Sequence, residues 1–88
     1  MSGEEQLEAL RARITELDRA IFELVNRRIE LVRELKQVKV DHDLPFVDPA
    51  REASMIEERE AENPGPLSAD GLRSFYLGLL ALVKRELG

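Results

Sequence analysis

The sequence contains no cysteine and no tryptophan, and His42 is its single histidine. Without thiols and with one imidazole, we expect no structural zinc site, no cysteine nucleophile and no serine–histidine–aspartate triad. No apolar run is long enough to cross a bilayer, and the N-terminal stretch MSGEEQLEAL lacks the basic start and apolar centre of a secretory signal. We therefore expect a cytoplasmic protein without metal, cofactor or membrane contact, whose chemistry depends on charged side chains.

Glycine and proline are also missing from Glu4 to Leu44. In this stretch apolar residues recur with heptad spacing, which is typical of a helix that packs against a partner along a narrow stripe. The apolar series consists of Leu7, Leu10, Ile14, Leu17, Ile21, Leu24, Leu31, Leu35 and Val38. The pattern predicts one long helix, whose apolar series is interrupted only at Arg28.

The second half of the chain predicts two shorter helices. Asp48 is expected to be the N-cap of the first, because Pro49 suits the first helical position, and Ser68 is expected to cap the second. The motif NPGP between them is a strong helix stop. No strand pattern is present, so we expect one all-α domain over residues 1–88. Its expected segments are a helix over about 4–43, a loop over 44–48, a helix over about 49–62, a turn over 63–67 and a helix over about 68–87.

Length and charge limit the partners of this domain. The chain has 88 residues and a net charge of −5, so a broad surface for nucleic acid is not expected. The predicted first helix would be a rod of roughly 60 Å, whereas a globule of this size has a radius of gyration near ~12 Å. One chain cannot cover such a rod. The simplest symmetric assembly that would cover it is a twofold homodimer in which the long helices lie against each other.

Several cations gather where this dimer would form a pocket. Arg28 occupies an apolar position of the heptad series, which requires either an anion nearby or a guanidinium that snorkels into solvent. Lys39 lies close to three turns further along nearly the same face. In an antiparallel helix pair, Arg11 of the other subunit comes level with this region. The motif VDPARE would cover the pocket, with Arg51 as a further cation and Glu52 as an acceptor; a merely capped, solvated helix start explains the same motif.

These residues resemble the all-helical class of chorismate mutases. The resemblance lies in LRARITELDRAIFELVNRR, ELVRELKQVK and VDPARE, and it covers nearly the whole chain. It implies an intertwined homodimer of three-helix chains with two shared active sites and no cofactor. It further implies that Arg11 of the other subunit and Arg28 bind the two carboxylates of chorismate. Lys39 would contact the ether oxygen, Glu52 would hold the ring hydroxyl, and the Asp48 region and Arg51 would close the pocket.

The reaction implied by this resemblance suits a chain without nucleophiles. Chorismate becomes prephenate in a unimolecular rearrangement that requires no base, metal or covalent intermediate. A protein accelerates it by holding the reactive conformer and placing positive charge beside the breaking C–O bond.

The third predicted helix departs from the family pattern. Many members have a serine there and a glutamine four residues later, whereas an ungapped alignment places Val83 and Leu87 at these positions. A shift of one residue would bring Glu86 to the second position. Two pocket-lining donors are then lost, and three interpretations follow. The chain is a mutase activated by a DAHP synthase, as the tail KRELG weakly suggests; or it acts on 4-amino-4-deoxychorismate or isochorismate; or it is a weakly active regulatory or binding module.

Overall fold

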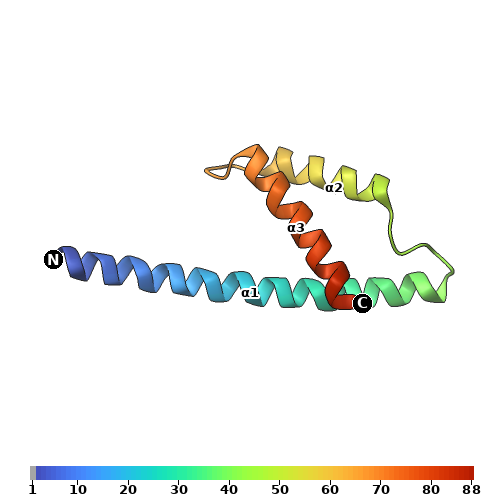
Figure 1. Ribbon diagram of the computed structural model, residues 1–88, viewed down its shortest axis with the longest axis horizontal. Coiled ribbons are helices and arrows are strands. Elements are labelled where there is room, and N and C mark those ends of the chain that lie inside the picture. Colours follow the sequence, from blue (N-terminus) through green and yellow to red (C-terminus); the bar gives the residue numbers. More distant parts are fainter. Residues whose placement is uncertain (1) are drawn as a thin grey trace. The chain divides into compact units, whose positions relative to one another are not determined.

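The computed structural model describes residues 2–88 as three α-helices (Figure 1). They are α1 (Gly3–Asp41), α2 (Pro49–Glu62) and α3 (Ala69–Leu87). No strand occurs within residues 2–88, which confirms the predicted all-α class with three helices and a long first helix. No helix in this part of the chain is long and apolar enough to cross a membrane. The chain divides into two compact units, one ending at Leu31 and one running from Val32 to Gly88.

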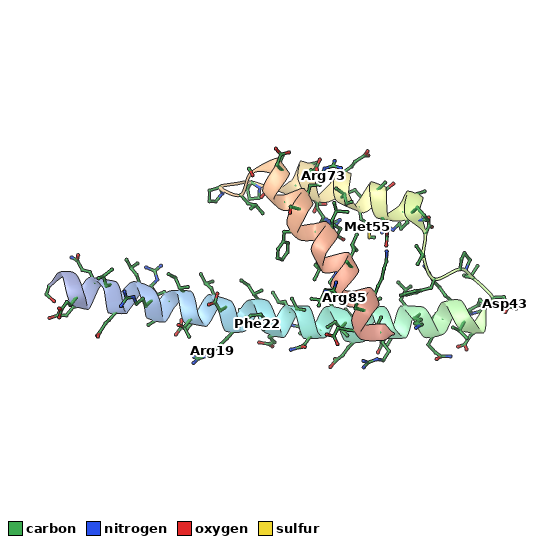
Figure 2. All side chains as sticks on the ribbon, viewed as in Figure 1. Arg19, Phe22, Asp43, Met55, Arg73 and Arg85 are labelled. Carbon is green, nitrogen blue, oxygen red and sulfur yellow. The ribbon has the colours of Figure 1, made fainter. Side chains whose placement is uncertain are left out.

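The end of α1 lies two residues before the position near 43 that the sequence predicts. Asp43 adopts a left-handed backbone with φ 55°, and Figure 2 shows it in the turn after α1. The amide of Leu44 donates to the carbonyl of Lys39 (2.8 Å), and that of Asp43 donates to the carbonyl of Val40 (3.3 Å). This pair of bonds is the Schellman arrangement, in which a left-handed residue terminates the helix. Asp43 takes the place that glycine usually occupies.

The first unit leaves a continuous apolar stripe uncovered. Every residue of α1 is described and none is buried. The stripe consists of Leu7, Leu10, Ile14, Leu17, Ile21 and Leu24, and each of these side chains is between 48% and 64% exposed. A contiguous exposed apolar surface of this kind is typical of a protein interface.

In the second unit, α2 and α3 pack together as a helical hairpin (Figure 1). Its core consists of Ile56 from α2 with Leu80 and Val83 from α3. The Tyr76 hydroxyl lies 3.8 Å from the Met55 sulfur, so a polar contact also joins α3 to α2. Figure 2 shows Met55 and Arg73 on these two helices. On α3 itself, Leu80 and Val83 are buried, whereas Phe75 and Leu77 are exposed.

Phe75 marks the side of α3 that α2 does not reach. Its side chain is 58% exposed. Two packed helices bury only the side chains that lie between them. Part of the broad apolar face of α3 therefore lies outside its contact with α2. The exposed aromatic ring therefore adds to the apolar surface of the chain.

Capping side chains fix the two ends of the hairpin turn. The Asn63 side chain donates to the Leu67 carbonyl (2.7 Å) and accepts from the Gly65 amide (3.2 Å). Gly65 has a φ of 82°, which glycine adopts without a Cβ penalty. The Ser68 hydroxyl accepts from the Gly71 amide (3.0 Å), which confirms the predicted N-cap of α3. The ion pair between Arg73 and Glu60 (2.8 Å) then joins α3 to α2.

Candidate functional site

Two lysines project from the last turns of α1 toward the loop and toward α3. Lys39 Nζ donates to the Phe46 carbonyl (3.0 Å), and Lys36 Nζ donates to the Leu87 carbonyl at the end of α3 (3.2 Å). Both ammonium groups also lie near the Phe46 ring, 5.4 Å from its centroid for Lys36 and 5.9 Å for Lys39. Carbonyl and ring contacts orient an ammonium group without cancelling its charge. The second unit therefore holds a small cationic cluster of Lys36 and Lys39.

The start of α2 is organised by Asp48. Its side chain accepts from the Arg51 amide (3.1 Å), as predicted for an N-cap, and its carbonyl accepts from the Glu52 amide (3.0 Å). Both bonds place Arg51 and Glu52 in the first turn, where a carboxylate gains from the helix dipole. The Arg51 guanidinium lies 3.9 Å from Glu58, with both side chains exposed. An ion pair of that kind contributes little to stability.

We predict that Asp48→Ala lowers the free energy of unfolding by about 1 kcal/mol, because the first turn of α2 loses a side-chain acceptor. Urea unfolding followed by circular dichroism measures the change. Asp48→Asn keeps an acceptor oxygen and is the matched control, for which we expect a loss of only a few tenths of a kcal/mol. Equal urea midpoints for the alanine variant and the parent would show that this cap does not stabilise the protein.

Glu52 forms the closest ion pair of the second unit. Its Oε1 lies 2.6 Å from Nζ of Lys84 on α3, and the side chains are 25% and 39% exposed. The pair joins the first turn of α2 to the last turns of α3. Glu52 was predicted as an acceptor for substrate, but Lys84 was not predicted to take part. An antiparallel hairpin places those two turns side by side, so the opposite charges were the signal that could have revealed the pair.

The two apolar positions at the end of α3 differ in their surroundings. Val83 is 2% exposed and belongs to the core of the hairpin, whereas Leu87 is half-buried and its carbonyl accepts from Lys36. Neither side chain carries a hydrogen-bond donor. Their place in the lining of a substrate pocket stays a prediction.

Arg11 and Arg28 lie on α1 in the first unit. Arg11 is exposed, and Arg28 is partly exposed. They are separated by 17 residues along one helix, roughly 25 Å at the rise of an α-helix. No small ligand spans that distance, so the two guanidinium groups of one chain cannot serve one small site. Their assignment to a site shared between two subunits also stays a prediction.

The sequence matches one model of a known protein family over most of its length. The model described as chorismate mutase type II matches residues 10–86, which is most of the chain. This chain belongs to the chorismate mutase type II family. The predicted resemblance to the all-helical chorismate mutases is thereby confirmed.

Relatives of this chorismate mutase family domain include much longer proteins and one of similar length. The T-protein of Haemophilus influenzae is 44% identical over 72 residues, which are 80% of this chain and 19% of that protein. The 4-amino-4-deoxychorismate mutase of Streptomyces venezuelae is 29% identical over 87 residues and is covered to 82%. The chain thus spans about a fifth of the T-protein and most of the second relative.

A solved structure of similar size supports the same fold. Chorismate mutase (form I) from Thermus thermophilus superposes with a TM-score of 0.86 at 31% sequence identity. The match covers 89% of this chain and 98% of the Thermus chain. The three-helix chain of the chorismate mutase family therefore extends over nearly all of both proteins.

Proposed function

We propose that this chain is a chorismate mutase, an isomerase that converts chorismate to prephenate. The observation that carries the proposal is the family match over residues 10–86. The near-complete superposition on the Thermus enzyme supports it, because fold and length agree together. The cationic cluster of Lys36 and Lys39 in the second unit adds positive charge, which a dianionic substrate requires.

The proposed mechanism depends on positioning and on charge. Arg28 and Arg11 of the other subunit would bind the two carboxylates and thereby hold the diaxial conformer, in which the reacting carbons are close. Lys39 would place its ammonium group beside the ether oxygen, where electron density grows as the C–O bond breaks. Its bond to the Phe46 carbonyl supports this role, because an oriented cation needs little reorganisation during the reaction. Glu52 would accept from the ring hydroxyl, while the Asp48 region and Arg51 would close the pocket.

A homodimer completes this proposal. The apolar stripe of α1 is exposed along its length, and a second copy of the same helix is the simplest surface that covers it. The twofold arrangement would supply Arg11 from one subunit to the site of the other. Each dimer would then contain two equivalent active sites.

The apolar end of α3 sets the expected rate. With Val83 and Leu87 at positions where many family members have donors, two hydrogen bonds to the substrate would be missing. Loss of one donor to a developing oxyanion costs on the order of 10² to 10³ in rate. We therefore propose a slow mutase whose activity a partner such as a DAHP synthase could raise.

A second candidate substrate is 4-amino-4-deoxychorismate. The Streptomyces relative named for that substrate aligns over 99% of this chain, which favours it over other chorismate analogues. The two substrates differ only in the ring substituent that would face Glu52. Discrimination between them therefore depends on the surroundings of that carboxylate.

The decisive experiment follows the disappearance of chorismate absorbance in the presence of the purified chain. We expect first-order, saturable conversion to prephenate at least about 10³-fold faster than in buffer, since enzymes reach 10⁶ or more and the missing donors lower this. Prephenate is identified by its acid-catalysed conversion to phenylpyruvate. A parallel reaction contains a DAHP synthase and tests whether such a partner increases kcat. Tight chorismate binding without turnover in either reaction would instead indicate a binding module.

A further inference from the structure

Lys84 places a second charge at the carboxylate proposed to bind the substrate ring. Its ammonium group lies 2.6 Å from Glu52 Oε1, and three quarters of the Glu52 side chain surface is shielded from solvent, since 25% is exposed. The two residues come from different helices that pack through a common core, so the pair has a defined position. A substrate group that approaches Glu52 therefore meets a carboxylate and an ammonium group together.

Such a pair distinguishes between polar groups by their charge and hydrogen-bonding capacity. A carboxylate accepts several hydrogen bonds, so the bond from Lys84 leaves acceptor capacity for another donor. A hydroxyl can donate to Glu52 while its own lone pairs accept from Lys84. An alkylammonium group has only donors, and its positive charge is repelled by Lys84 at hydrogen-bonding distance from Glu52.

We propose that Lys84 is a specificity-determining residue that, with Glu52, selects a ring hydroxyl over a ring ammonium group. The inference rests on the proposed function, because it requires Glu52 to face the ring substituent. It assigns chorismate rather than 4-amino-4-deoxychorismate as the preferred substrate. Specificity of this kind arises from a repulsive element as well as from an attractive one.

The charge of Lys84 also weakens Glu52 as a partner for a cation. A single carboxylate would attract an ammonium substituent, whereas the Glu52–Lys84 pair has no net charge to offer it. A variant that removes only the Lys84 ammonium group restores that attraction. Lys84→Met is suitable because methionine keeps an unbranched apolar stem beside α2.

The test compares kcat/KM for the two substrates in the full chain and in three variants. Lys84→Met is expected to shift the ratio of kcat/KM values about tenfold toward 4-amino-4-deoxychorismate, since the half-exposed position screens part of the Coulomb effect. Lys84→Arg keeps the charge and should keep hydroxyl preference. Arg85→Met is the matched control, because it removes one positive charge from the next residue of α3 (labelled in Figure 2). Arg85 is exposed, and its replacement should leave the ratio unchanged.

Each result either supports or overturns the inference. If Lys84 acts only by joining α2 to α3, Lys84→Met lowers both kcat/KM values and the melting temperature together, and an unchanged ratio rejects the specificity role. A parent chain that prefers the amino substrate also rejects it. These failures differ from failure of the proposed function, in which the parent chain converts neither substrate; that result would overturn both proposals.

Discussion

Replacing Arg28 by alanine is expected to lower kcat/KM for chorismate by about 10² to 10³, because the proposed site loses a fixed cation that binds a carboxylate throughout the reaction. KM should rise, since a carboxylate anchor contributes to ground-state and transition-state binding alike. The value of kcat should also fall, since Arg28 is proposed to help hold the diaxial conformer. Steady-state kinetics with chorismate measure both constants. The variant is informative because Arg28 interrupts an otherwise apolar heptad series.

Arg27→Ala provides the matched control for this prediction. It removes the same side chain one position earlier, from an exposed position of the same helix, and leaves the net charge equal to that of the Arg28 variant. Kinetics close to those of the parent are expected for Arg27→Ala. Sedimentation should show that both variants have the same molecular mass as the parent. Parental kcat/KM in Arg28→Ala would remove this residue from the site.

Local sequence signals were sufficient for the start of each shorter helix. Asp48 before Pro49 predicted an N-cap, and Ser68 predicted another, because capping depends on side chains within one turn of the helix end. The three-helix composition followed from the absence of strand patterns and from the NPGP motif. The long first helix followed from heptad spacing without glycine or proline. Each of these features is determined by residues close together in the sequence.

Features that depend on tertiary packing were harder to predict. The Glu52–Lys84 pair joins residues 32 positions apart, so it requires knowledge of how α2 and α3 face each other. The exposure of Phe75 reflects the limited area that one neighbouring helix covers. Periodicity identifies an apolar face but not which part of that face a neighbour reaches.

The roles proposed for Arg11 and Arg28 require a second chain, and mixing two variants of very low activity provides the sharpest test. Arg11→Ala and Arg28→Ala chains, each with at most about 1% of parental activity alone, are combined at equal concentration and allowed to exchange subunits. Random exchange makes about half of the dimers heterodimers, and each of these has one site with both arginines and one with neither. We expect recovery to about one quarter of the parental activity, a rise of at least about 25-fold over either variant.

The size of this recovery distinguishes a shared site from one formed within a single chain. If both arginines of one site came from the same subunit, every site in the mixture would lack one of them, and exchange would restore nothing. The separation of roughly 25 Å between the two residues along α1 makes that arrangement incompatible with a small substrate. Mixing either variant with the Arg11→Ala, Arg28→Ala double variant is the control, because no combination in that mixture rebuilds a site. Recovery that develops at the rate of subunit exchange would therefore locate Arg11 and Arg28 of one active site on different chains.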